Sequence, residues 1–247
     1  MKGLFIIGTD TGVGKTWVTG ALARALRRRG YDVGVCKPIQ SGNLKDDPAG
    51  DAMTLRRLAD VSDSISDICL CALPQPVAPQ LAMRLSNVDI YMEDVVSFCR
   101  RASNRHEWLF VEGAGGVAVP YVSDAWVSDV IRALDLPVLI VARPGLGTVN
   151  HSILTIEYLR NQDIRVVGVV FNRSSALCTE NDTDSRLMVL LEETNASYIR
   201  ESTGVPVFGA LPHISSFTSE LDIVNLVEEN INLRGLLESL GSVYSGD

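Results

Sequence analysis

Short, continuously apolar runs alternate along the whole chain with longer segments of helical period, and this alternation restricts the fold more than any other feature. The apolar runs cover residues 3–8, 33–37, 108–112, 138–142, 166–172 and 207–211. Strands that are apolar on both sides suit a parallel sheet covered on both faces. Helices are expected at 15–29, 51–60, 88–102, 126–134, 149–162, 183–203 and 220–240. The order predicts a doubly wound α/β fold, with a mainly parallel sheet and helices on both faces.

No linker divides the chain. With 247 residues, of which 46% are hydrophobic, it can bury a large core, and we expect a single domain over 1–247. Residues 61–86 lack a clear period and contain Pro74, Pro76 and Pro79, which keep their neighbours extended. This segment is interpreted as an ordered loop.

Charge and cysteine usage restrict the partners and the compartment. A net charge of −8 leaves no general electrostatic footprint for nucleic acid or an anionic membrane surface, so neither is expected as a partner. The five cysteines lack zinc-ligand spacing; Cys69 and Cys71, for example, are separated by one residue. No apolar stretch reaches the length of about 18 residues that a membrane span needs, and a strand begins within three residues of Met1. We expect reduced thiols and a cytoplasmic protein.

The first expected strand runs into the glycine-rich stretch "GTDTGVGKT", residues 8–16, which opens the first helix. In such a turn backbone N–H groups and the helix N-terminus attract phosphate, a lysine reaches the terminal phosphates, and the next hydroxyl ligates magnesium. Lys15 and Thr16 occupy those two positions. Five residues rather than the usual four separate Gly8 from Gly14. The alternative is an ordinary strand-to-helix turn with a capping threonine, but the context favours a nucleoside triphosphate site.

Three further segments follow expected strands, at the edge where open α/β sheets bind ligands. They are "CKPIQSG" (36–42), "VEGAGG" (111–116) and "VARPGLGTVNH" (141–151). Glu112 ends a buried strand, where a carboxylate is costly without a cation such as phosphate-bound magnesium. Lys37 could be an ordinary surface lysine, but the flanking Pro38 and Gly42 form a tight loop that favours a place in the site. Asp51 could cap the helix that it opens, ligate the metal, or do both.

Six motifs, "GTDTGVGKT", "KPIQSG", "GDAMTL", "VEGAGG", "GLGTVNH" and "GALP", occur in the order and at roughly the positions found in the dethiobiotin synthetase family. The resemblance runs from the first strand to about residue 214. That family belongs to the P-loop NTPases and has a deviant phosphate loop, which accounts for the extra residue before Gly14.

The resemblance implies an ATP-dependent enzyme that closes the ureido ring of dethiobiotin from 7,8-diaminononanoate and CO2, with Mg2+ as cofactor. An amine captures CO2 as a carbamate, the carbamate oxygen attacks the γ-phosphate, and the second amine displaces phosphate from the mixed anhydride. Each step creates or moves negative charge. Such chemistry depends on cations in a fixed array and on positioning of the two amines.

The same resemblance assigns roles residue by residue. Lys37 matches the catalytic lysine, and Lys15 would assist at the γ-phosphate. Thr16, Asp51 and Glu112 match the magnesium positions, and Thr11 and Ser41 match residues beside the diamine and its carbamate. The implied nucleotide contacts are Gly12, Val13, Gly14, Lys15, Thr16, Trp17, Asp51, Glu112, Gly113, Ala114, Gly115, Asn172, Arg173, Pro212, His213 and Ile214.

Arg173 departs from the pattern, because the family member compared has an acidic residue after the asparagine, so base selectivity is left open. The family's enzymes are homodimers in which a helix N-terminus of the partner subunit holds the substrate carboxylate. Leu146, Gly147 and Asn150 match that segment and are expected to contact substrate in trans. Free N–H groups at a helix N-terminus suit a carboxylate.

Two other functions are alternatives. A cobyrinate-type amide synthetase shares the deviant loop but carries an added glutaminase domain, for which the 33 residues after Ile214 are too few. A ParA/MinD-like ATPase switch would have a lysine early in the phosphate loop, where this chain has Thr9 to Thr11. It would also have a basic amphipathic tail, whereas the last expected helix is acidic.

Overall fold

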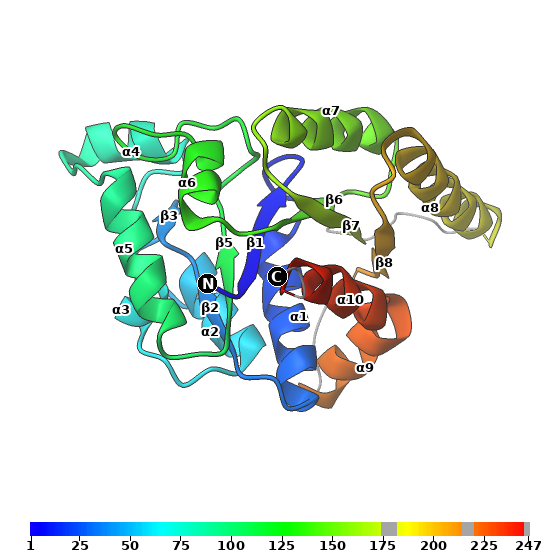
Figure 1. Ribbon diagram of the computed structural model, residues 1–247, viewed down its shortest axis with the longest axis horizontal. Coiled ribbons are helices and arrows are strands. Elements are labelled where there is room, and N and C mark those ends of the chain that lie inside the picture. Colours follow the sequence, from blue (N-terminus) through cyan, green and yellow to red (C-terminus); the bar gives the residue numbers. More distant parts are fainter. Residues whose placement is uncertain (174–181, 214–219, 245–247) are drawn as a thin grey trace.

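The computed structural model describes residues 1–173, 182–213 and 220–244. Its centre is a six-stranded sheet of order β2-β5-β1-β6-β7-β8, in which every neighbouring pair is parallel (Figure 1). The strands are β1 (Gly3–Gly8), β2 (Val33–Cys36), β5 (Trp108–Glu112), β6 (Val138–Ala142), β7 (Val166–Asn172) and β8 (Val207–Leu211). The expected doubly wound fold is confirmed, and all six expected strands agree with the structure to within one residue.

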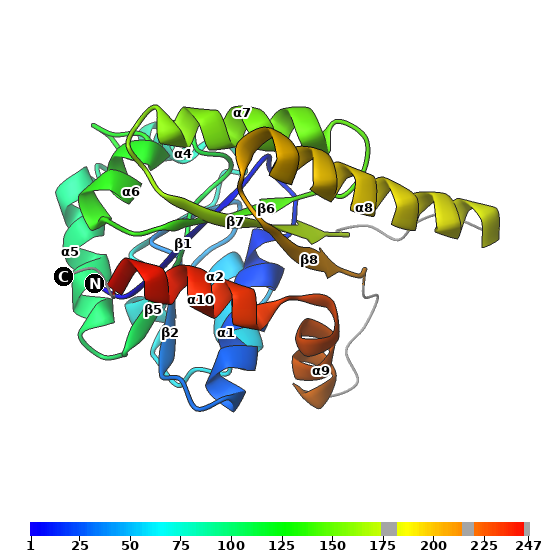
Figure 2. The same ribbon diagram turned by 45° about the vertical axis from the view of Figure 1, so that its right-hand side comes forward.

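Helices cover both faces of the sheet (Figure 2). Alternate residues of β1 point to opposite sides, as strand geometry requires. Phe5 and Ile7 join the apolar core beneath α5, α6, α7 and α8, whereas Leu4 and Ile6 join the core beneath α1, α2, α9 and α10. The helices are α1 (Lys15–Arg28), α2 (Asp51–Ala59), α3 (Ile65–Ile68), α4 (Pro79–Ser86), α5 (Met92–Ser103), α6 (Val127–Leu134), α7 (Thr148–Arg160), α8 (Asp182–Thr203), α9 (Glu220–Asn230) and α10 (Leu233–Tyr244).

The interpretation of residues 61–86 as a loop is wrong for much of the segment. It contains α3, α4 and the short strand β4 (Cys71–Leu73), which pairs in parallel with β3 (Ile39–Ser41). Ser64 caps α3 by accepting a hydrogen bond from the N–H of Asp67, and Pro79 occupies the first turn of α4, where its missing N–H costs nothing. Elements this short give almost no periodicity in the sequence.

The single helix expected over 220–240 is also wrong, because the chain forms two helices there. The break falls at Ile231, which makes an antiparallel bridge with Gly209 of β8. The N–H of Asn232 then donates to the carbonyl of Phe208 at 2.7 Å. This pairing with the edge strand is a tertiary contact that helical period cannot reveal.

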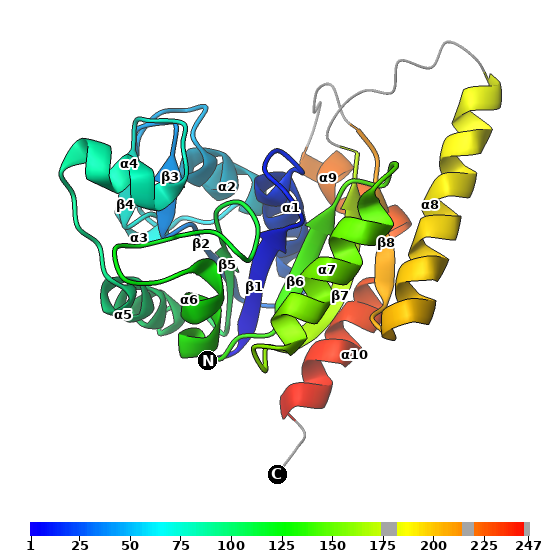
Figure 3. The same ribbon diagram turned by 90° about the horizontal axis from the view of Figure 1, so that it is seen from above.

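Strand order places the site. After β1, the chain forms β2 and β5 on one side of β1 and then β6, β7 and β8 on its other side. The direction of strand addition therefore reverses at β1, and the two halves of the sheet meet at its carboxyl end. Ligands bind at such switch points in open α/β sheets. The loop between β1 and α1 lies along this edge in Figure 3. Among the described residues, no helix is long and apolar enough to cross a membrane.

Candidate functional site

The loop between β1 and α1 is shaped by two glycines in the left-handed region. Gly12 has a φ of 74° and Gly14, which caps α1, has a φ of 87°. A Cβ at Gly14 would lie 2.1 Å from Nδ2 of Asn172, so only glycine fits. That amide also donates to the carbonyl of Val13 at 2.9 Å. The loop is therefore fixed from the end of β7, with α1 pointing its positive N-terminus into the site.

Lys15, the first residue of α1, is 8% exposed. Its Nζ donates to the carbonyl of Asp10 at 3.3 Å. Burial and the nearby Lys37 lower the pKa of Lys15 to about 8, although Glu112 and Asp51 oppose the shift. Two ammonium groups thus lie near one another at the end of the sheet, an arrangement that an anion between them would stabilise.

Lys37 is 2% exposed, so its interpretation as an ordinary surface lysine is wrong. Strand register explains its neighbour: Cys36 pairs with Val111, which places the next residue of each strand, Lys37 and Glu112, side by side. The Lys37 ammonium lies 2.6 Å from Oε1 of Glu112 and 3.0 Å from Oδ2 of Asp51, and donates to the carbonyl of Gly113 at 2.9 Å.

The charges of this cluster depend on one another. Burial alone would lower the pKa of Lys37, but Glu112 and Asp51 raise it above its ordinary value. Burial raises the pKa of Glu112, and Lys37 offsets only part of that shift. The pKa of Asp51 is lowered, because Lys37 and Thr16 outweigh its burial. The ammonium of Lys37 therefore stays charged and compensates both carboxylates.

The cluster includes oxygen ligands suited to magnesium. The Thr16 hydroxyl lies 2.8 Å from Oε1 of Glu112 and 3.2 Å from Oδ1 of Asp51. Oε2 of Glu112 is buried without a hydrogen-bond partner. Across the described part of the chain, no group of three or more His, Cys, Asp or Glu side chains could hold a metal alone. Mg2+ is commonly held by one or two carboxylates together with phosphates and water, so these residues fit it.

Asp51 does not cap α2, and that interpretation is wrong. Gly50 is the N-cap residue, and Asp51 is the first residue of the helix. The start of α2 is instead held by Gln40, whose Oε1 accepts from the N–H of Ala52 at 2.7 Å while its Nε2 donates to two loop carbonyls. Gln40 has no role assigned from the sequence, although it is a polar residue within the otherwise functional motif "KPIQSG".

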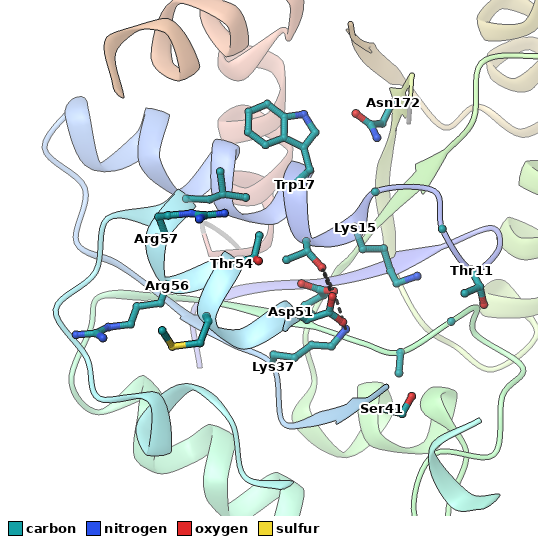
Figure 4. A pocket seen from close by; sticks show the side chains of 18 of the residues that line it. Thr11, Lys15, Trp17, Lys37, Ser41, Asp51, Thr54, Arg56, Arg57 and Asn172 are labelled. Carbon is teal, nitrogen blue, oxygen red and sulfur yellow. Dashed lines mark hydrogen bonds and ion pairs between the residues drawn. The ribbon is translucent and has the colours of Figure 1, made fainter. Parts of the chain in front are cut away.

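A pocket of about 1510 Å³ brings most of the expected site residues together (Figure 4). Those that line it are Thr11, Gly12, Gly14, Lys15, Thr16, Trp17, Lys37, Ser41, Asp51, Glu112, Ala114, Gly115, Asn172, Arg173, Pro212 and His213. Val13 and Gly113 are buried behind this surface. Ile214 lies outside the described residues.

One wall of the pocket has no role assigned from the sequence. Pro76 to Pro79 and Val119 form this apolar wall in the same pocket that contains Ser41. Arg173, an expected nucleotide contact, also lines the pocket and binds Glu192 of α8 through two nitrogens, at 2.5 and 2.8 Å. Only the fold brings the residues of the apolar wall together, and only the fold pairs Arg173 with Glu192.

The expected carboxylate-binding residues lie away from this pocket. Leu146 is 98% exposed, and Gly147 is the N-cap of α7 with a φ of 89°. Asn150 is exposed in the first turn of that helix. The structure does not bring them to Lys37 and Ser41 of the same chain.

Solved structures share this fold. The MinC:MinD cell division protein complex of Aquifex aeolicus gives a TM-score of 0.54 at 16% identity, covering 100% of this chain and 97% of that chain. The ParA family ATPase of Chlorobium tepidum gives 0.51 at 15% identity, covering 97% and 95%. Such low identity shows the fold alone. The parallel sheet, the glycine-rich loop after its central strand and the buried lysine define a P-loop NTPase.

Comparison with sequence relatives identifies the family within the P-loop NTPases. A family model described as "AAA domain" matches residues 2–220. A protein of Bacillus licheniformis named ATP-dependent dethiobiotin synthetase BioD is 38% identical, with 97% of each chain covered. One of the same name from Bacillus subtilis subsp. natto is 39% identical, covering 98% of this chain and all of that one. The chain belongs to the ATP-dependent dethiobiotin synthetase family.

Proposed function

We propose that this chain closes the ureido ring of dethiobiotin from 7,8-diaminononanoate, CO2 and ATP. One amine adds to CO2 and loses a proton to give a carbamate. A carbamate oxygen then bonds to the γ-phosphorus as the bond to ADP breaks. The second amine attacks the carbamate carbon, a proton is lost, and phosphate leaves. The observation that carries the proposal is Lys37, buried against Glu112 and Asp51 in the same pocket as Lys15 and Ser41.

The two lysines would supply the cations that this sequence of anions requires. Lys37 is proposed to neutralise the carbamate and the transferring phosphoryl group, and Lys15 to bind the γ-phosphate oxygens. Because both ammonium groups are largely buried, they interact with a developing charge more strongly than they would in water. Thr11 and Ser41, which line the same pocket, are proposed to orient the diamine and its carbamate (Figure 4).

Thr16, Asp51 and Glu112 are proposed to hold Mg2+, which would supply positive charge to neutralise the phosphates. The buried, unpartnered Oε2 of Glu112 supports this assignment, since such an atom is costly without a partner. Lys37 now lies against Oε1 of Glu112 and Oδ2 of Asp51, and its ammonium serves as their counter-ion.

Asn172, Arg173, Pro212 and His213 are proposed to surround the base. The carbonyl of Val13 fixes the orientation of the Asn172 amide, so its buried, unpartnered Oδ1 is left as an acceptor. An acceptor in this position favours a base with an exocyclic amino group, as adenine has. Gly12 to Trp17 and Glu112 to Gly115 would contact the phosphates and ribose.

A homodimer would complete the site through Leu146, Gly147 and Asn150 of the partner, with the substrate carboxylate at the N-terminus of α7. Apolar side chains exposed on α7 and α8 support such an interface. They are Leu154 at 61%, Leu187 at 53%, Leu190 at 58% and Tyr198 at 53% exposed. Large apolar side chains exposed on two neighbouring helices are typical of interfaces.

We further propose that 1–247 is a single domain and that the enzyme works in the cytoplasm on small molecules, without nucleic acid or membrane.

The test is phosphate release from ATP, measured with purified protein and Mg2+, with and without diamine and bicarbonate. We expect release that requires both substrates and matches dethiobiotin formation one to one. ATP turnover indifferent to the diamine would contradict the proposal and favour a ParA/MinD-like switch.

A further inference from the structure

Asp10 puts a carboxylate inside the phosphate loop, where the ligand itself is strongly anionic. Its Oδ1 accepts from the N–H of Thr11 at 2.7 Å, and its carbonyl accepts from Nζ of Lys15 at 3.3 Å. The residue therefore contacts both a loop amide and the lysine proposed to bind the γ-phosphate. An uncompensated negative charge at this position would repel a triphosphate.

Arg143 provides the compensating charge from a distant part of the sequence. Its Nη2 lies 3.0 Å from Oδ2 of Asp10, and both side chains are 51% exposed. Arg143 directly follows β6, whose Val141 carbonyl accepts from the N–H of Thr9. The ion pair and this backbone bond join the phosphate loop to the end of β6.

The segment that carries Arg143 is itself held in place. Nδ2 of Asn195, on α8, donates to the carbonyl of Pro144 at 2.8 Å. The chain then reaches Gly147 and the N-terminus of α7. The segment that contains Arg143 is therefore held by contacts to α8 and to the phosphate loop.

We propose that Arg143 is a positioning residue for the nucleotide: it neutralises and orients Asp10, so that the phosphate loop accepts a triphosphate. It acts through Asp10 and makes no contact with the nucleotide. The inference rests on the proposed nucleotide site, and it adds a residue that the resemblance to the family did not assign.

The experiment measures the Kd of a non-hydrolysable ATP analogue with Mg2+ by calorimetry. We expect Arg143→Ala to weaken binding about fivefold, the upper range for one exposed charge pair. Arg143→Lys should keep most of the affinity. Asp10→Asn in the Arg143→Ala background should restore it, because the amide can still accept from Thr11 but carries no charge. Raising the salt concentration to about 0.5 M should shrink the Arg143→Ala effect.

Arg29→Ala is the matched control, since Arg29 lies 3.0 Å from Glu228, with the two side chains 39% and 38% exposed, at the end of α1 opposite the loop. It should leave the Kd unchanged.

An Arg143→Ala affinity within twofold of wild type would overturn the inference. The inference would also be overturned if the Asp10→Asn, Arg143→Ala double variant bound the analogue as weakly as Arg143→Ala, because Arg143 would then contact the nucleotide directly. If Arg143→Ala does not fold, Arg143→Gln takes its place. Wild-type protein that binds the analogue but fails the diamine-dependent assay would refute the proposed function and leave this inference standing.

Discussion

At the scale of residues, the site contains two buried charges, Lys37 and Glu112, and a partly exposed one, Asp51, which stabilise one another. Lys37, Asp51 and Glu112 come from three separate segments, and each of the two carboxylates lies within 3.0 Å of the same ammonium. Removing one member of such a group leaves another charge uncompensated. The loss of stability is then usually larger than the net stabilisation that the intact group provides. Catalysis by such an array depends on charge already in position when negative charge develops.

Lys37→Ala tests the role of that charge. We expect kcat for dethiobiotin formation to fall by about two to three orders of magnitude, since the lost cation acts on charge that develops during reaction. The Kd of an ATP analogue should change by only a few-fold. Lys45→Ala removes a nearby lysine that donates to the carbonyl of Leu70 and should leave both quantities unchanged. An equal loss of nucleotide affinity and kcat would argue against the assignment of Lys37.

A second group of charges stabilises the protein away from the pocket. The side chain of Asp63 is 9% exposed and lies 3.1 Å from Nε2 of His106 and 3.2 Å from Nε of Arg105. Burial alone would raise the pKa of Asp63, but these partners hold it below its ordinary value of 3.8. A lowered carboxyl pKa contributes stability above the ordinary pKa, and that stability is lost as the pH falls through the lowered value.

Asp63→Asn should therefore lower the free energy of unfolding at pH 7 and pH 5, and the difference from wild type should shrink by pH 3. Urea unfolding at the three pH values measures it. The exposed Asp46→Asn serves as control, with no difference expected at pH 7. A difference that persists undiminished at pH 3 would show that the lost contacts are not electrostatic.

At the scale of elements, sequence pattern predicted what is long and periodic. The expected helix at 88–102 is α5 (Met92–Ser103), the one at 126–134 is α6 (Val127–Leu134), and those at 149–162 and 183–203 agree with α7 and α8 to within two residues. β3, β4 and α4 were missed because they are short and contact one another across distant parts of the sequence. The break at Ile231 was missed because it depends on the bridge to Gly209 of β8.

Gly20 shows how closely two elements must approach to build the site. It lies inside α1, where a Cβ would stand 2.4 Å from Cβ of Leu58 on α2. Since Thr16 on α1 and Asp51 on α2 meet at 3.2 Å, the spacing of the two helices sets the geometry of the proposed metal site.

Gly20→Ala should destabilise the protein by about 1–2 kcal/mol, because overpacking outweighs the helix propensity of alanine, and kcat should fall as α2 shifts. Urea unfolding and steady-state kinetics measure the two effects. Gly241→Ala is the control: it lies in α10 with nothing within 4 Å of an added Cβ, so it should stabilise by up to about 1 kcal/mol. A neutral or stabilising Gly20→Ala would mean that the helices are not held at this distance.

At the scale of the whole molecule, the site of one chain is proposed to be incomplete. Lys37 and Asn150 of one chain would then belong to two different active sites, and the partner subunit would complete each of them. In Figure 3, α7 and α8 lie on the side of the sheet away from α1, and α8 extends past the strands.

Mixing two inactive variants tests this arrangement. Lys37→Ala lacks the proposed catalytic cation, and Asn150→Asp places a negative charge where the substrate carboxylate would bind. In a dimer completed in trans, half of the randomly exchanged dimers are mixed and each has one intact site, so roughly a quarter of wild-type activity should return. The control is each variant mixed with itself. Activity that stays at the level of the separate variants after proven exchange would place the whole site in one chain.

The sheet, the phosphate loop and the candidate residues could be predicted from the sequence, because strand hydrophobicity, glycine spacing and the order of motifs are local properties. Three features could not: the sharing of charge among Lys37, Glu112 and Asp51, the start of α2 on Gln40 rather than on a capping aspartate, and the contact of Arg143 with Asp10. These depend on strand register and helix packing, which join segments that lie far apart in the chain. Distances of about 3 Å between charged atoms are set by those contacts and leave no pattern in the sequence.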